Sequence, residues 1–123
     1  MAATVKTQPE QLRDRTKAFA LRVIRLFRSL PYKPDAQVLG KQMLRCGTSV
    51  AANYRAVCRS RSKAEFISRM GVVVEEADEA VLWLELLTES GIVPEEKTLE
   101  LLAEARELTA IFTASQHTAR SAA

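Results

Sequence analysis

Four carboxylates in the second half of the chain come nearest to a spacing that could bind a metal. Glu75, Glu76, Asp78 and Glu79 lie within one short run. Carboxylate-bridged metal sites in helical bundles also need inward-facing Glu-x-x-His pairs, and the single histidine of the chain is His117, near its C-terminus. The sequence therefore predicts no metal and no other cofactor, and the run indicates a solvated acidic helix face.

The chain has few candidate residues for nucleophilic catalysis. Cys46 and Cys58 are 12 residues apart on one predicted helix, about 18 Å at ~1.5 Å per residue, which is too far for a disulfide. A catalytic pair with His117 would depend on a tail that we expect to fray. The chain has no glycine-rich phosphate loop and no Cys/His cluster with zinc spacing. We predict no catalytic residue; a small enzyme would need an ordered ligand or metal among Glu75, Asp78 and Glu79.

Basic side chains are the remaining group with a chemical use, because they can bind phosphate. Residues 1–70 contain 15 Lys/Arg and 4 Asp/Glu, whereas residues 71–123 contain 3 and 11. The two formal charges, +11 and −8, give the net +3. This imbalance favours an anionic partner for the first half, most simply RNA or DNA bound through its phosphates. Alternatively, the acidic half neutralises the basic half within the folded protein.

The candidate nucleic-acid-binding residues lie on the outer faces of the first two predicted helices and on the loop after them. They are Arg15, Arg22, Arg25, Lys41, Arg45, Arg55, Arg59, Arg61 and Lys63. On the first helix, Arg13, Lys17 and Arg28 lie at the flanks of this outer face. Few aromatic residues occur among these charges, so we expect recognition of shape and phosphate instead of base stacking.

Capping and breaking residues divide the chain into four helices. Thr7 and Glu10 form a capping box, Ser62 and Glu65 form a second one, and Asp35 is the expected cap between them. The predicted boundaries are Thr7 to Pro31, Asp35 to about Arg59, Ser62 to Ser90, and Pro94 to about Gln116. No stretch shows the period-2 alternation of a strand. The predicted fold is an all-α, antiparallel up-down-up-down four-helix bundle over residues 9–116, with flexible ends at residues 1–8 and 117–123.

A polar group interrupts the second predicted helix. Thr48, Ser49 and Asn53 lie close to Gly47, which costs about 1 kcal/mol relative to alanine inside a helix. We therefore expect a close approach of another helix at Gly47. The three polar residues are expected to make structural hydrogen bonds that fix this packing, and contact with a ligand is the alternative.

The third predicted helix has more apolar residues than one core requires. One stripe at heptad-like spacing faces the core, whereas Val72, Leu82, Trp83 and Leu86 lie well off its centre. A second apolar face is typical of a subunit contact. We predict a homo-oligomer that uses these four residues; the alternative is that Trp83 only covers the edge of the bundle.

Four runs of residues carry a resemblance to a known family: Gly-Thr-Ser-Val-Ala-Ala-Asn-Tyr-Arg at 47–55, Arg-Ser-Lys-Ala-Glu-Phe at 61–66, Glu-Glu-Ala-Asp-Glu at 75–79 and Trp-Leu-Glu-Leu-Leu at 83–87. With them the chain resembles bacterial four-helix bundle proteins encoded in intervening sequences of large-subunit ribosomal RNA genes. That family is similar to the accessory variability determinant of diversity-generating retroelements, which partners a reverse transcriptase and nucleic acid. The resemblance implies a ring-shaped homopentamer with no established catalytic activity and a role in nucleic-acid binding.

These observations favour a non-enzymatic, oligomeric helical scaffold that binds structured RNA or DNA. The second hypothesis is a protein-interaction module that docks an acidic partner or a reverse transcriptase. No stretch approaches the roughly 18 uncharged apolar residues of a membrane span, and the first residues do not resemble a secretory signal. We therefore expect a cytoplasmic protein without a membrane partner.

Overall fold

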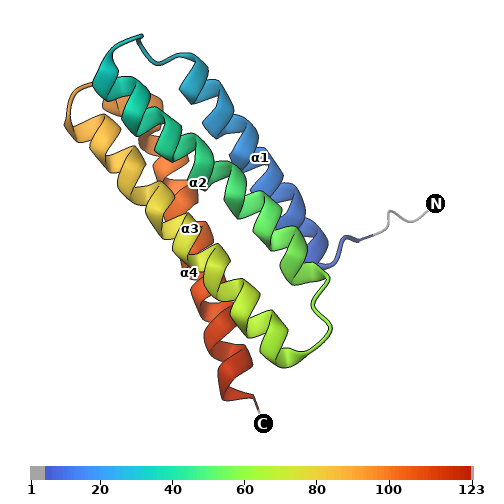
Figure 1. Ribbon diagram of the computed structural model, residues 1–123. Helices are drawn as coiled ribbons and strands as arrows, with labels where there is room; N and C mark the ends of the chain where they lie inside the picture. Colours follow the sequence, from blue (N-terminus) through green and yellow to red (C-terminus); the bar gives the residue numbers. More distant parts are fainter. Residues whose placement is uncertain (1–4, 123) are drawn as a thin grey trace.

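Four long α-helices make up nearly the whole molecule. The computed structural model describes residues 5–122; the predicted flexible residues 1–4 and 123 lie outside this range. The helices are α1 (Gln8–Arg28), α2 (Pro34–Cys58), α3 (Lys63–Glu89) and α4 (Glu95–Ser121), and they run up, down, up and down beside one another (Figure 1). Since the described residues contain no strand, the predicted all-α four-helix bundle is confirmed. None of these helices is long and apolar enough to cross a membrane.

Predicted capping residues begin two of the helices. At the start of α1, Thr7 Oγ1 accepts a hydrogen bond from the Glu10 N–H, and the Glu10 carboxylate accepts one from the Thr7 N–H, both at 3.3 Å. At the start of α3, Ser62 Oγ accepts from the Glu65 N–H at 3.0 Å. The carboxylate of Glu65 does not complete this second box, because it pairs with Arg69 at 2.6 Å.

The predicted cap at Asp35 is wrong. α2 begins one residue earlier, at Pro34, whose ring already holds the helical φ and whose missing N–H costs nothing in the first turn. Lys33 is the N-cap residue and makes no side-chain hydrogen bond there. Asp35 therefore lies inside the first turn, where its carboxylate accepts from the Ala36 N–H at 2.9 Å and faces the positive end of the helix dipole.

The two later helices end differently from each other. α3 stops before Gly91, whose φ of +82° lies in the left-handed region that favours glycine. α4 continues past Gln116, where the helix was expected to fray. Gln116 donates to the Ile67 carbonyl at 3.1 Å, and Lys63 donates to the Ala122 carbonyl. These bonds to α3 explain why the last turns of α4 remain helical although their sequence is small and polar.

The core draws on all four helices and is tightest between α1 and α2. A Cβ atom placed on Gly47 would lie 2.8 Å from both γ carbons of Val23, which is closer than packed carbon atoms approach. The predicted close packing at Gly47 is therefore confirmed. Across the core, the rings of Tyr54 and Phe112 stack with centroids 5.3 Å apart and join α2 to α4.

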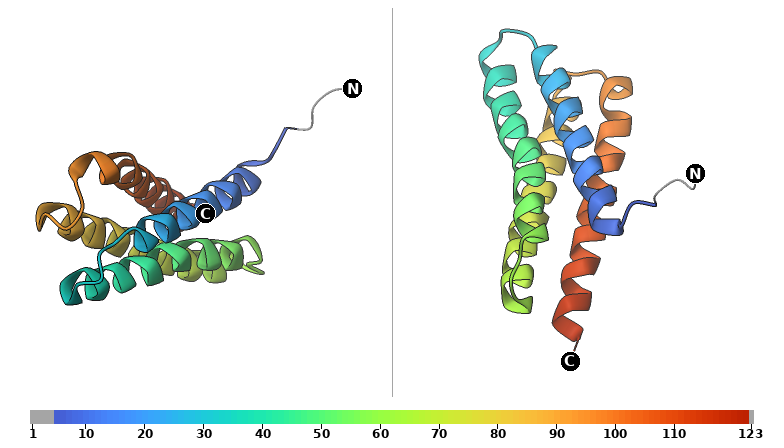
Figure 2. Two further views of the ribbon diagram at one scale, coloured as in Figure 1. Left: turned by 90° about the horizontal axis from the view of Figure 1, so that it is seen from above. Right: turned by 90° about the vertical axis from the view of Figure 1, so that its right-hand side faces the viewer.

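One helix is shorter than the others, and this shapes one end of the bundle. α1 has 21 residues, α2 has 25, and α3 and α4 have 27 each. At ~1.5 Å per residue, α1 is about 6 to 9 Å shorter than its neighbours. In the right-hand view of Figure 2, α4 and the α2–α3 loop extend beyond the first turn of α1. The grooves described below open at this end.

Candidate nucleic-acid interface

The charge that divides the sequence into halves is also divided between the two ends of the folded bundle. The basic end comprises residues 5–17, 53–70 and 108–122, which together contain 10 Lys/Arg and 3 Asp/Glu. The mixed end comprises residues 22–42 and 82–104, which together contain 6 Lys/Arg and 7 Asp/Glu. Most of these cations lie in residues 22–42, and most of the acids lie in residues 82–104. α4 has no acidic residue after Glu107, so the acidic half contributes no carboxylate to the segments of the basic end.

Several of these cations line a groove between α1 and α2, which we name the basic groove. It has a volume of about 520 Å³, and its lining residues are Lys6, Glu10, Arg13, Asp14, Lys17, Arg55, Cys58 and Arg59. The lining has five cations and two acids. α1 supplies one wall and the last turn of α2 supplies the other.

Both acids of the basic groove already have partners. Lys6 forms an ion pair and hydrogen bond with Asp14, and this bond lowers the pKa of the Asp14 carboxyl. The Glu10 carboxylate accepts the cap hydrogen bond described above. The remaining cations, Arg13, Lys17, Arg55 and Arg59, form no ion pair with any described residue. Four cations of the groove thus form no ion pair with the described residues, and the lining as a whole has a formal charge of +3.

Five of the nine predicted binding residues lie at the basic end; Arg15 is one of them but pairs with Glu104 of α4, and the other four have no ion-pair partner among the described residues of the acidic half. Arg55 and Arg59 line the basic groove. Arg61 and Lys63 follow on the exposed α2–α3 loop and the first position of α3. Arg61 lies 3.8 Å from Glu65, and its side chain is largely exposed. The structure therefore brings these four predicted residues to one end of the molecule.

Two predicted binding residues are neutralised by the acidic helices. Arg15 reaches across to α4 and pairs with Glu104 at 2.6 Å, and Arg45 reaches across to α3 and pairs with Glu79 at 3.0 Å. The hydrogen bonds to these carboxylates raise the pKa of both guanidinium groups. For Arg15 and Arg45, charge neutralisation within the bundle is the observed outcome.

The last three predicted residues lie away from the basic groove. Arg22 and Arg25 line a separate groove between α1 and α4, and that groove also contains Glu96 and Glu100. Lys41 is exposed in the first half of α2 and forms no ion pair with a described residue. These three positions face a surface of mixed charge, so they are weaker candidates than Arg55 and Arg59.

The candidate set omitted three residues of the basic groove: Lys6, Arg13 and Lys17. Helical phase alone placed Arg13 and Lys17 on the flank of α1. Because α2 packs along that flank, both side chains meet the cations of α2 from the opposite wall. The periodicity of the sequence gives the flank, but it does not say which neighbouring helix lies there.

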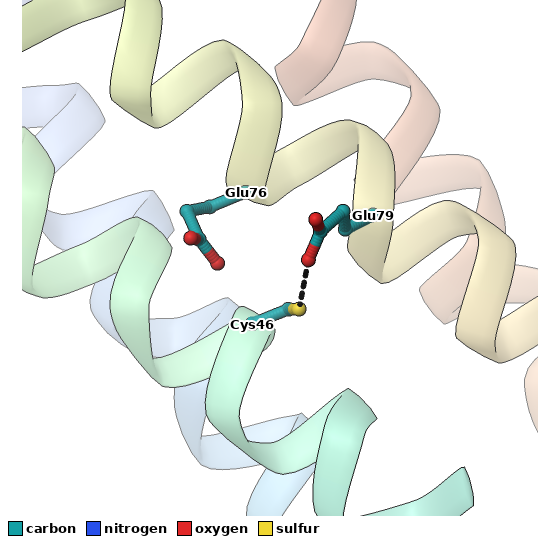
Figure 3. Close-up of side chains that lie close together, drawn as sticks. All are labelled: Cys46, Glu76 and Glu79. Carbon is teal, nitrogen blue, oxygen red and sulfur yellow. Dashed lines mark hydrogen bonds between the residues drawn. The ribbon is translucent and has the colours of Figure 1, made fainter.

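The cluster with the most metal-like geometry contains Cys46, Glu76 and Glu79, whose ligand atoms lie within 4.8 Å of one another (Figure 3). The Cys46 thiol donates to Glu79 at 3.1 Å. Burial, together with this bond, raises the pKa of Cys46 to about 12, and the bonds from Cys46 and Arg45 lower the pKa of Glu79. Arg45 also lies 3.4 Å from Glu76.

Arg45 pairs with both carboxylates of this cluster and supplies their positive counter-charge. The cluster is thus an ion-pair network that joins α2 to α3. Glu75 and Asp78, the other two members of the acidic run, are exposed and form no ion pair with described residues.

The polar residues around Gly47 bond within their own helix. The hydroxyl of Thr48 donates to the Leu44 carbonyl at 2.7 Å. Asn53 Nδ2 donates to the carbonyl and hydroxyl oxygens of Ser49 at 2.9 and 2.7 Å. These bonds satisfy polar groups of α2 itself. The predicted structural hydrogen bonds are therefore present, and they are made within α2 and not to another helix.

The second apolar face of α3 remains largely uncovered. Val72, Leu82 and Leu86 are 41%, 46% and 39% exposed. Trp83 is half-buried, and its indole N–H is buried without a hydrogen-bond partner among the described residues. The three aliphatic side chains present an apolar surface on the outside of the bundle. Its use as a subunit contact stays a prediction.

Comparison with known proteins places the chain among small helical bundles. The family model described as 23S rRNA-intervening sequence protein matches residues 10–114. A crystal structure of a protein with unknown function from the S23 ribosomal protein family of Bacteroides thetaiotaomicron is 28% identical, with a TM-score of 0.82, and covers 90% of this chain and 99% of that chain. No functionally curated protein matches.

Proposed function

The chain belongs to the 23S rRNA-intervening sequence protein family, and we propose that it binds structured RNA or DNA through the basic groove. The observation that carries this proposal is the set of four cations without acidic partners on the facing walls of one groove. In this proposal the protein acts by binding and not by catalysis.

The arrangement of the four cations suits a phosphate backbone. Arg13 and Lys17 are one helical turn apart on α1, and Arg55 and Arg59 are one turn apart on α2. Residues four apart have Cβ atoms about 5 to 6 Å from each other, so each wall presents a short row of charge. Binding of phosphates needs closely spaced positive charge and no base-specific geometry.

Salt dependence tests this proposal directly. For a structured RNA hairpin, we expect log affinity to fall linearly with log salt, with a slope of roughly −0.9 or −0.7 per phosphate contact. Arg55→Ala with Arg59→Ala should make the slope shallower by about 1 to 2 units. Lys33→Ala with Lys41→Ala is the matched control, because it removes the same charge from the mixed end. An unchanged slope in the first variant would count against the basic groove.

The same experiment separates the proposal from its main rival. If the protein neither retains nucleic acid on purification nor binds the hairpin at low salt, docking of an acidic protein or a reverse transcriptase becomes the better hypothesis. The ratio of absorbance at 260 and 280 nm of the purified protein is the first measurement.

We also propose that the protein is a homo-oligomer that buries the apolar face of α3, with Val72, Leu82, Trp83 and Leu86 at the contact. The pentameric ring implied by the family resemblance is the expected stoichiometry. Leu82→Asp with Leu86→Asp should dissociate the oligomer in sedimentation velocity, whereas Leu21→Asp, on an exposed position of α1, should not. A species of only ~14 kDa for the unmodified chain at tens of micromolar would refute self-association.

A further inference from the structure

A second groove adjoins the basic groove at the same end of the bundle, and we name it the end groove. It has a volume of about 470 Å³, and its lining residues are Pro9, Tyr54, Val57, Cys58, Ser60, Arg61, Ser62 and Phe66. Cys58 lines both grooves. The two grooves therefore lie next to each other, one with a mainly cationic lining and the other with a mainly apolar lining.

The end groove exists because α1 begins late. The first turn of α1, at Pro9, forms one edge, and the α2–α3 loop forms the other. Tyr54 and Val57 are buried beneath it, whereas Phe66, in the first turn of α3, is only partly buried.

The polar atoms of the end groove lie in its loop wall. Arg61 is exposed, and its one ion pair, with Glu65, is long at 3.8 Å. Ser60 Oγ is buried and makes no hydrogen bond with any described residue. Ser62 Oγ accepts the cap bond of α3. The groove thus combines an aromatic edge, a guanidinium group and an unsatisfied hydroxyl.

We propose that the end groove accepts one unpaired nucleobase of a strand whose phosphates lie in the basic groove. The inference rests on the proposed function and adds the class of nucleic acid: a helix that carries an unpaired nucleotide at an end or a bulge. A base is a flat ring with apolar faces and polar edges. Its faces can stack on Phe66 and on the guanidinium plane of Arg61.

The position of the groove favours a base over an apolar segment of a protein. Its volume lies in the range of small-ligand sites. It shares Cys58 with the basic groove and its four cations without ion pairs, so an apolar peptide bound there would place its flanks near positive charge. A nucleotide carries its anionic phosphate next to its base and matches both grooves at once.

The test compares three RNA duplexes with the unmodified protein: one blunt, one with a single unpaired adenosine at an end, and one with an abasic residue at that position. The duplex with the unpaired adenosine should bind roughly 10-fold tighter than the abasic duplex, from which it differs only by one base that can stack. It should also bind more tightly than the blunt duplex, which lacks the whole nucleotide. Placing 2-aminopurine at the unpaired position should give quenched fluorescence in the complex. Overhangs at the 3′ and 5′ ends are measured separately.

Variants identify the residue that stacks. Phe66→Leu keeps an apolar side chain and should remove the preference for the unpaired base, and Phe66→Ala should do the same if it folds. Tyr32→Ala is the matched control, because Tyr32 is 97% exposed in the α1–α2 loop at the mixed end. This control should keep the preference.

The outcomes separate the inference from the proposed function. Equal affinity for all three duplexes, with Arg55→Ala and Arg59→Ala still weakening each, would overturn the end groove as a base site and leave phosphate binding intact. Loss of the preference in Tyr32→Ala but not in Phe66→Leu would overturn the assignment to Phe66. No binding of any duplex would overturn both.

Discussion

The two ends of the bundle are made by the same four helices and differ in both charge and shape. At the mixed end, α1 and α2 with the loop between them carry most of the cations, while the end of α3 and the first half of α4 carry most of the acids. At the basic end, α4 contributes no carboxylate beyond Glu107. Antiparallel packing therefore neutralises a basic helix only where acidic residues lie level with it.

Helix length adds the difference in shape. Because α1 is short, the basic end contains two adjoining grooves, which meet at Cys58. Between the two ends, the pairs Arg15–Glu104 and Arg45–Glu79 join basic helices to acidic ones. A modest net charge thus conceals one end that can attract an anion and a middle that holds the helices together.

The largest expected difference is between the reaction rates of the two cysteines with a thiol reagent, which test whether the grooves of the basic end are accessible to solvent. Cys58 is exposed in the grooves, whereas Cys46 is buried in the Arg45 network. At pH 8 a thiol with a pKa of about 12 is ionised in roughly one molecule in 10⁴, so it reacts roughly 10³-fold more slowly than an ordinary thiol. Under native conditions, Ellman's reagent should modify one cysteine rapidly, and Cys58→Ser should abolish that phase. A rapid phase that survives Cys58→Ser would contradict the assigned burial of Cys46.

Charge reversal compares the ends directly. Arg55→Glu with Arg59→Glu should weaken binding of an RNA hairpin by roughly 100-fold at 0.1 M salt, because two phosphate contacts are lost and repulsion is added. Arg25→Glu with Arg28→Glu makes the same change on α1 at the mixed end and should weaken binding by less than about 5-fold. Equal losses, measured by fluorescence anisotropy, would mean that net charge alone governs binding and that neither end is a site.

Glycine substitutions compare the tight middle of the bundle with the basic end. Gly47→Ala should lower the free energy of unfolding by about 1 to 3 kcal/mol, since the new Cβ would meet the stiff side chain of Val23. Gly71→Ala would meet only the flexible end of Gln116. Its gain in helix propensity should keep the net change within about 0.5 kcal/mol. Urea unfolding measures both, and a larger loss for Gly71→Ala would reverse this ranking.

Much of the fold followed from local signals. The capping box at Thr7 and the stop at Gly91 each depend on a few neighbouring residues. The tail of α4 did not follow, because Gln116 and Lys63 stabilise it through bonds between helices that are far apart in sequence. The start of α2 was misplaced because proline at the first position made a capping side chain unnecessary.

The candidate site was only half predictable. Arg13 and Arg15 are two residues apart on α1, yet Arg13 lines the basic groove and Arg15 pairs with Glu104. Helical periodicity places them on opposite flanks. Which flank meets α2 and which meets α4 depends on the handedness of the bundle, and periodicity carries no information about handedness. The charge imbalance was therefore visible in the sequence, while the groove that concentrates it was not.

The smallest expected effect is a change in melting temperature, and it concerns the ion-pair network of Arg45 and Glu79 between α2 and α3. The pKa of Glu79 is lowered from 4.5 in the folded protein, first by the Cys46 thiol and then by Arg45. A carboxyl group whose pKa is lower in the folded state than in the unfolded state stabilises the fold at pH values above its unfolded-state pKa. This stabilisation is lost as the pH falls through the folded-state pKa. Since Glu79 is exposed, Glu79→Gln should lower the melting temperature at pH 7 by no more than about 2 °C.

Below about pH 4 this difference in melting temperature should shrink, and it should vanish once Glu79 is protonated in the folded state. Glu75→Gln is the control, because Glu75 is an exposed residue of the same helix without an ion pair to the described residues; its melting temperature should follow that of the unmodified protein at every pH. If Glu79→Gln lowers the melting temperature equally at pH 3 and pH 7, the loss comes from packing. The charge of Glu79 would then contribute nothing to stability, and the neutralisation of the middle of the bundle would rest on the Arg45–Glu76 pair and on the ion pairs of Arg15.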